Sequence, residues 1–257
     1  MNNLKDLWNY RMMIGSLVKK ELIARYKGSV LGFLWTFINP LFQLIIYTVL
    51  FSVIMRSGID NYAMFLFVGL VPWLFCATSL TTGSMSVVMS AGLVQKIYFP
   101  RMVLPIVSVT ANFVNMLLSF VIVFIALIAT GVGIAPVAAM LPVVMIIEYF
   151  FVLGLVLIFS GLAVYFRDLE HILGIVTMAW MYLTPILYTV DMVPPALQTF
   201  MKYNPMTGVI LSYRNVLYYQ TMPEFDMLLL TVVYAAIFMV VGYFVFQRLQ
   251  RKFAEEL

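Results

Sequence analysis

LPIVSVTANFVNMLLSFVIVFIALIAT, Leu104–Thr130, is a continuous apolar stretch that contains no charged residue. About 20 residues of this kind cross the hydrocarbon core of a bilayer as an α-helix. A helix is favoured there because it satisfies its backbone hydrogen bonds within the segment itself. The stretch therefore predicts a transmembrane helix.

The rest of the chain has the same character. Of its 257 residues, 64% are hydrophobic and 10% are charged, whereas a soluble domain has about 25% charged residues. Other apolar runs predict five further spans, which are Leu31–Met55, Tyr62–Met89, Val137–Phe166, Ile172–Val190 and Met227–Gln247. The predicted fold class is therefore an all-α integral membrane protein with six transmembrane helices.

The basic residues predict the orientation. An even number of spans puts both termini on the same side of the membrane. If Gln95–Arg101 and Arg167 lie on that side too, it carries 12 of the 15 Lys and Arg residues. The opposite side then carries Arg56, Lys202 and Arg214. This imbalance favours cytoplasmic termini in a multi-pass protein of the cytoplasmic (inner) membrane. The basic residues flank apolar runs rather than forming patches, so membrane lipids, not nucleic acid, are the expected partners.

Three segments outside the spans have patterns of their own. Leu4–Arg25 places apolar residues at helical spacing among basic ones, as in a helix on the membrane surface, although a simple topology anchor would look the same. Ser90–Pro105 is either a short transverse helix or an ordinary charged loop. In Asp191–Asp226, prolines and a glycine divide an apolar segment into pieces too short to span, which predicts two re-entrant or interfacial helices.

Enzyme motifs are scarce. No G-x-x-x-x-G-K-[ST] phosphate-binding loop is present, so we expect a transport subunit with ATP hydrolysis in a separate chain. The sole histidine, His171, follows Arg167, Asp168 and Glu170, a grouping more typical of a solvated boundary than of a metal or catalytic site. We therefore predict no catalytic residue, metal or cofactor in this chain. The sequence contains a single cysteine, Cys76, so an internal disulfide is excluded. The apolar surroundings of Cys76 predict a buried thiol.

Glu148 is the one acidic residue well inside a predicted span. An ionised carboxylate in hydrocarbon is costly unless it faces water or a partner, so it is a functional candidate by default. It could line a pathway, take part in packing, or couple transport to protons. No second acidic residue accompanies it in the spans, which favours the first two roles.

Aromatic residues make up 16% of the chain. Their apolar faces can pack against the C–H faces of sugars, but membrane proteins also use aromatic residues for lipid contacts. Both interpretations stay open. The candidates for a substrate path are Phe33, Trp35, Phe37 and Phe42 in the first predicted span, and Trp180, Tyr182 and Tyr188 in the fifth.

Several short motifs occur together in a set order. They are RYKGSVLGFLWTFINPL at Arg25–Leu41, YFPRMVLP at Tyr98–Pro105, YFRDLEHIL at Tyr165–Leu173, LTPILY at Leu183–Tyr188 and YNPM at Tyr203–Met206. In this order the chain resembles the permease subunits of ABC-2 type polysaccharide exporters, which move O antigens, capsules and teichoic acids. The resemblance covers nearly the whole chain.

The resemblance implies a homodimer docked to two ATP-binding cassette ATPase subunits, which bind ATP and Mg, with a lipid-linked polysaccharide passing between the two copies. Leu4–Arg25 resembles the interface helix, and Pro194–Tyr219 resembles a pair of outer gate helices. The residues similar to the coupling helix that enters the ATPase are Val94, Gln95, Lys96, Ile97, Tyr98, Phe99 and Pro100. Arg167, Asp168, Glu170 and His171 resemble a second cytoplasmic contact.

The expected organisation is a single membrane domain, residues 1–257, with an interface helix (1–27), spans one to five (28–190), an outer re-entrant segment (191–226) and a last span with its tail (227–257). One alternative is an ABC-2 exporter of a drug or lipid. Another is an ion-coupled secondary transporter that uses Glu148. A third is a membrane enzyme acting on lipid-linked sugar through His171 and the nearby carboxylates.

Overall fold

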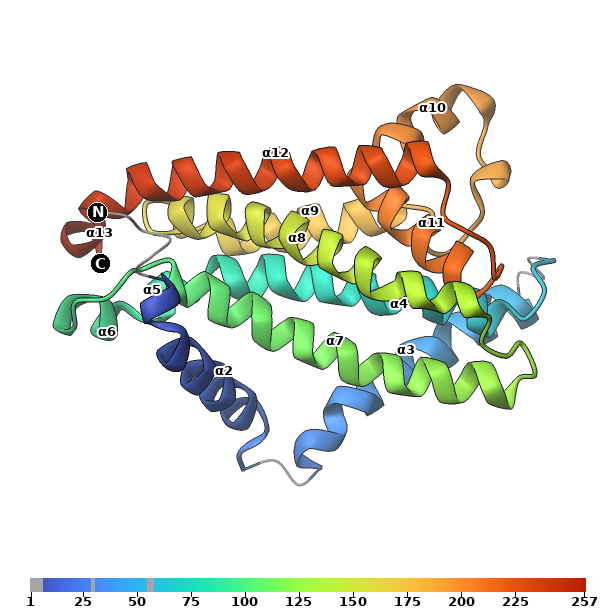
Figure 1. Ribbon diagram of the computed structural model, residues 1–257, viewed down its shortest axis with the longest axis horizontal. Coiled ribbons are helices and arrows are strands. Elements are labelled where there is room, and N and C mark those ends of the chain that lie inside the picture. The colour runs from blue at the N-terminus through green and yellow to red at the C-terminus, as the bar shows by residue number, and fades with distance from the viewer. Residues whose placement is uncertain (1–6, 29–30, 55–57) are drawn as a thin grey trace.

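The longest helices of the protein form a bundle along one axis, and two helices near the N-terminus run obliquely to it (Figure 1). The computed structural model describes residues 7–28, 31–54 and 58–257, and in this part of the chain every regular element is helical. Within the same residues, four helices are long and apolar enough to cross a membrane: Tyr62–Gly83, Val103–Ala129, Pro136–Ala163 and Phe225–Lys252. The all-α prediction is confirmed, whereas the count of six spans is not.

The helices follow one another along the chain with short connections. The N-terminal half contains α2 (Arg11–Tyr26), α3 (Trp35–Thr48) with a π-helical end (Val49–Ile54), α4 (Tyr62–Thr78) with a π-helical end (Ser79–Gly83), α5 (Ser86–Met89), α6 (Ala91–Lys96) and α7 (Val103–Ala129). The C-terminal half contains α8 (Leu141–Ala163), α9 (Leu169–Tyr182), α10 (Pro195–Tyr203), α11 (Pro205–Leu217), α12 (Phe225–Leu249) and α13 (Phe253–Glu256).

The fifth predicted span differs most from the structure. We predicted Ile172–Val190, but α9 has 14 residues and ends at Tyr182. Pro185 disfavours helical geometry in the residue before it, so the helix stops although the sequence stays apolar. The first predicted span is also divided, since the 14-residue α3 continues as a six-residue π-helix.

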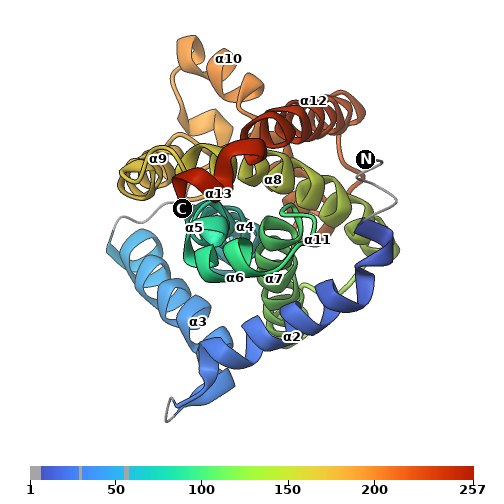
Figure 2. The same cartoon turned by 90° about the vertical axis from the view of Figure 1, so that its left-hand side faces the viewer.

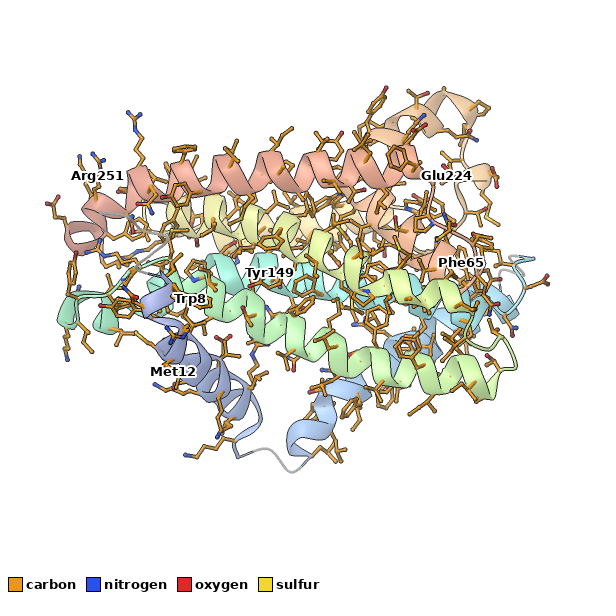
Figure 3. The ribbon with its side chains drawn as sticks, in the orientation of Figure 1. Trp8, Met12, Phe65, Tyr149, Glu224 and Arg251 are labelled. Carbon is orange, nitrogen blue, oxygen red and sulfur yellow. The ribbon has the colours of Figure 1, made fainter. Side chains whose placement is uncertain are left out.

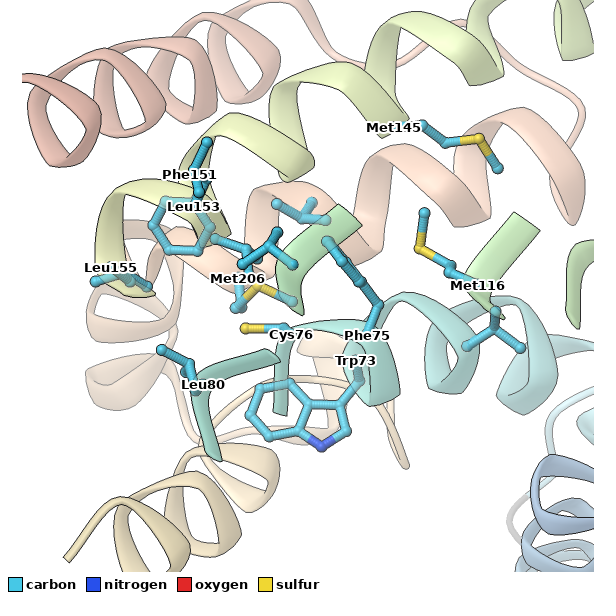
Figure 4. Close-up of a cluster of buried hydrophobic side chains, with 14 of the residues drawn as sticks. Trp73, Phe75, Cys76, Leu80, Met116, Met145, Phe151, Leu153, Leu155 and Met206 are labelled. Atoms are coloured by element: carbon cyan, nitrogen blue, oxygen red, sulfur yellow. The ribbon is translucent and has the colours of Figure 1, made fainter. Parts of the chain in front are cut away.

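The core is built around α4. Thirteen of its 17 residues are buried, against α3, α7 and α11. Figure 4 shows the side chains of Trp73, Phe75 and Cys76 from this helix among apolar side chains such as Met206 from α11. The predicted burial of the Cys76 thiol is confirmed, since this residue is fully buried.

Helices α8 and α12 form the most extensive helix pair. A Cβ atom on Gly242 would lie 2.3 Å from the carbonyl oxygen of Gly154, and one on Gly154 would lie 2.4 Å from the backbone carbon of Phe238. Only glycine allows this approach, because the two backbones are in direct contact where the helices meet. The rest of α12 is largely exposed, as expected for a helix that faces lipid.

The molecule has two distinct ends. Trp8 of the N-terminal segment and Arg251 of the C-terminal segment lie at one end, and Phe65 and Glu224 lie at the other (Figure 3). Figure 1 places α6 and α13 at the first end and α10 at the second. These are called the α6 end and the α10 end below.

Candidate functional site

A cavity of about 470 Å³ lies between the end of α2 and the helices α3, α4 and α7. Its lining contains an unusual share of polar side chains for a bundle of apolar helices. The polar lining residues are Arg25, Thr36, Asn39, Gln43, Thr78, Asn112, Asn115 and Ser119, and the others are Trp35, Pro40, Val71, Leu74, Phe75 and Met116.

A hydrogen-bond network closes the cavity where α2 ends. The guanidinium of Arg25 donates to the carboxylate of Glu21 at 2.6 Å and to the amide oxygen of Asn112 at 2.5 Å. The amide nitrogen of Asn112 donates in turn to the hydroxyl of Thr82 at 3.2 Å. Asn112 is 3% exposed, so this network connects the surface helix α2 with the interior of the bundle.

The amides of this cavity were not among the residues predicted from the sequence. A signal for them exists, because Asn39 and Gln43 in α3 are four residues apart, and Asn112 and Asn115 in α7 are three apart. Each pair therefore lies on one face of its helix. Polar pairs inside apolar spans generally face partners or water-filled space.

The aromatic residues predicted in the first span are only partly at this cavity. Trp35 lines it and is 38% exposed, whereas Phe42 is 59% exposed and is absent from the lining. Phe37 is half-buried. The side chain of Phe33 lies outside the described residues.

The aromatic residues predicted in the fifth span do not line this cavity. The indole nitrogen of Trp180 donates to the amide oxygen of Asn204 at 2.9 Å, and its ring packs edge-on against Trp73. Tyr188 donates to the carbonyl of Tyr182 at 2.7 Å. Tyr182 is 58% exposed, so of these three it has the most accessible ring, whereas the contacts of Trp180 indicate packing.

The predicted coupling segment is at the α6 end. Its helix, α6, stops at Lys96, and residues 97–100 continue without helical structure. Val94 and Phe99 are buried, Pro100 is half-buried, and Gln95, Lys96, Ile97 and Tyr98 are exposed. The second predicted contact is also accessible, because Arg167, Asp168, Glu170 and His171 are all exposed.

The C-terminal segment packs beside both predicted contacts. Phe253 is fully buried and touches the rings of Tyr165 and Phe246, while Arg101 lies over its ring and donates to the carbonyl of Gln250. The hydroxyl of Tyr165 donates to the carbonyl of Leu249 at 2.9 Å. Burial, and less strongly the nearby carboxylates of Glu256 and Glu255, raise the pKa of Tyr165, so its hydroxyl stays protonated as a donor.

At the α10 end, α10 and α11 are the two short helices predicted between Asp191 and Asp226, and each has a proline in its first turn. Arg214 in α11 is 1% exposed. Its guanidinium donates to the carbonyls of Phe65, Pro185 and Ile186 and lies 3.5 Å above the ring of Phe65. We predicted Arg214 on the side opposite the termini, and there it is a buried residue that joins α4, α11 and the segment after α9.

Glu148 in α8 is fully buried. One carboxylate oxygen accepts a hydrogen bond from Tyr213 at 2.6 Å, and the other has no hydrogen-bond partner among the described residues. Glu148 is not part of the lining of the cavity. Its surroundings therefore resemble a packing position more than a pathway.

Together these features define an all-helical, multi-pass membrane protein with a polar cavity between its helices. Residues 13–218 match the ABC-2 type transporter family, and the chain belongs to that family. It is accordingly a transport permease and not an enzyme. The family resemblance seen in the sequence motifs is confirmed.

Two curated relatives extend over nearly the whole chain, and a third covers three quarters of it. The chain is 34% identical to the O-antigen export system permease protein RfbA of Myxococcus xanthus over 99% of its own length and 98% of that protein. A protein of the same name from Klebsiella pneumoniae is 34% identical over 99% of this chain and 100% of the relative. The capsule polysaccharide export inner-membrane protein CtrC of Neisseria meningitidis serogroup B is 28% identical over 76% of this chain and 75% of that protein.

Proposed function

We propose that this chain is the membrane-spanning permease subunit of an ABC transporter that exports a lipid-linked polysaccharide across the cytoplasmic membrane. The observation that carries the proposal is the match, at 34% identity and nearly full length, to permeases named for O-antigen export. ATP, with Mg, is bound and hydrolysed by a separate ATPase subunit.

The proposed assembly contains two copies of the chain and two ATPase subunits. The exposed residues of the coupling segment and of residues 167–171 favour the α6 end as the ATPase-binding surface. With that end in the cytoplasm, both termini are cytoplasmic, and α10 and α11 act as gate helices at the outer side. This orientation agrees with the excess of basic residues near the termini.

The proposed path for the glycan lies between the two copies. Helices α3 and α9 flank one side of the molecule when it is viewed along its long axis (Figure 2). Phe42 in α3 and Tyr182 in α9 are exposed aromatic residues that could contact sugar rings there. Trp180 fits this role less well, because it is hydrogen-bonded to Asn204.

Deletion of the gene in the source organism tests the proposal. Surface polysaccharide should disappear and lipid-linked glycan should accumulate in the cytoplasmic membrane, because synthesis continues without export. The tagged chain should copurify with an ATP-binding cassette subunit, and the purified chain alone should not hydrolyse ATP. If the deletion leaves surface polysaccharide unchanged, polysaccharide is refuted as the cargo. The same holds if polysaccharide is exported normally while a drug or simple lipid accumulates in the cells.

A further inference from the structure

We propose that the cavity between α2, α3, α4 and α7 binds an uncharged sugar unit of the exported glycan within a single copy of the chain. This inference rests on the proposed function, and it adds a binding site separate from the path between the two copies. Gln43 and Asn39 are the residues that would bind the sugar. Arg25 lies at the end of the cavity, where its guanidinium is bonded to Glu21 and Asn112.

The first argument is the convergence of polar side chains. Asn39 and Gln43 project from one face of α3, and Asn115 and Ser119 project from one face of α7, into the same cavity. Amide side chains inside apolar spans are costly unless they meet polar partners. Within the described residues, the side chains of Asn39 and Gln43 take part in no hydrogen bond, so their donors and acceptors remain available to a ligand.

The second argument concerns charge. Among the described residues that line the cavity, Arg25 is the one that carries a charge, and its guanidinium is bound to Glu21 and Asn112. Its charge is therefore compensated within the protein, and a phosphate would have to displace the Glu21 carboxylate in order to use it. A neutral ligand needs no such exchange. The geometry thus favours an uncharged sugar over the phosphate of the lipid carrier.

The third argument is the match between the groups and a sugar. An amide both donates and accepts hydrogen bonds, as a sugar hydroxyl does. Trp35 adds a partly exposed aromatic ring to the lining, and such a ring can cover the apolar face of a sugar. The volume of about 470 Å³ is within the range of about 300–1,000 Å³ that small-ligand sites occupy.

Two conservative substitutions test the binding role. Gln43→Met and Asn39→Leu keep the approximate size of each side chain but remove its hydrogen bonds. Each should lower export by about tenfold, as loss of one or two hydrogen bonds to a ligand does. Ile46→Leu, at an exposed position of the same helix, should export normally. Normal export by both amide variants would overturn the inference.

Photocrosslinking in exporting cells gives a readout that does not depend on transport rate. A benzoylphenylalanine at Gln43 should form adducts that stain for carbohydrate, and one at Phe244, an exposed residue of α12, should not. Carbohydrate adducts at Phe42 but none at Gln43 would overturn the inference and leave the proposed function intact.

The same adducts identify the source of the sugar. They should vanish in a strain that cannot assemble the exported glycan, and adducts that persist there would assign the cavity to a membrane glycolipid and overturn the inference. Surface polysaccharide that does not depend on this chain would instead refute the proposed function itself.

Discussion

At the scale of single residues, Arg214 is a buried cation held by backbone groups. Its guanidinium donates to the carbonyls of Phe65, Pro185 and Ile186, which come from two different segments. Arg214→Met would fill similar space but leave three carbonyls without this donor. At about 1 kcal/mol or more for each lost bond, we expect the apparent Tm in detergent to fall by about 6–12 °C.

Lys202→Met is the matched control, because Lys202 lies in α10 at the same end of the molecule and is exposed. It should leave the Tm unchanged, since exposed charges contribute little to stability. An equal Tm for the Arg214 variant and the wild-type protein would contradict the bridging role.

Glu148 poses a different question, because a buried carboxylate could serve proton coupling or packing. In Glu148→Gln the amide oxygen can still accept the hydrogen bond from Tyr213, so the packing role predicts that ATP-dependent export is largely retained. Export should also continue when an ionophore collapses the proton gradient while ATP is maintained. Complete loss of export by a normally assembled variant, together with dependence on the gradient, would support ion-coupled transport instead.

At the scale of elements, the contact between α8 and α12 depends on two glycines. A methyl group on Gly242 would lie 2.3 Å from the carbonyl oxygen of Gly154, which is backbone and cannot rotate away. Gly242→Ala should therefore force the helices apart and destabilise the protein by about 1–3 kcal/mol. Gly15→Ala in α2, where the added methyl group meets open space, should be neutral or slightly stabilising. Thermal unfolding of both variants measures the difference, and equal Tm values would contradict the close contact.

The C-terminal segment connects the elements of the α6 end. Phe253 packs against Tyr165, which precedes the second predicted contact at residues 167–171. Arg101, which follows the coupling segment, lies over the ring of Phe253. Replacement of a buried phenylalanine by alanine costs about 3–5 kcal/mol in protein cores. Because α13 has only four residues, we expect Phe253→Ala to release this segment rather than unfold the bundle.

The expected result is loss of coupling. The reconstituted complex with Phe253→Ala should continue to hydrolyse ATP while the amount of glycan exported per ATP falls, because the two proposed ATPase contacts are no longer held together. Glu255→Ala, at an exposed neighbouring position, serves as the control and should keep the ratio unchanged. An unaltered ratio in the Phe253 variant would show that the cluster is not needed for coupling.

At the scale of the whole molecule, local hydropathy predicted the long helices well. The predicted span Leu104–Thr130 and the observed helix Val103–Ala129 differ by one residue at each end. The fifth span was predicted too long, because its apolar composition continues past Tyr182 while Pro185 disfavours helical geometry in the residue before it. The cavity was not predicted, because its amide side chains come from α3 and α7, which only the tertiary fold brings together.

The orientation of the whole molecule and the position of its ATPase partner can be tested with one pair of positions. The resemblance assigned Val94 and Ile97 alike to the coupling segment, but Val94 is 5% exposed and Ile97 is 54% exposed. In a Cys76→Ser background, Ile97→Cys should therefore crosslink to a cysteine on the ATPase, and Val94→Cys should do so much more slowly. Both positions lie within a few residues of each other, so the comparison separates exposure from distance along the chain.

If the α6 end is cytoplasmic, a membrane-impermeant maleimide should label Ile97→Cys in inverted membrane vesicles and leave it unlabelled in intact cells. Labelling from outside the cell would reverse the orientation and remove the coupling role from this segment.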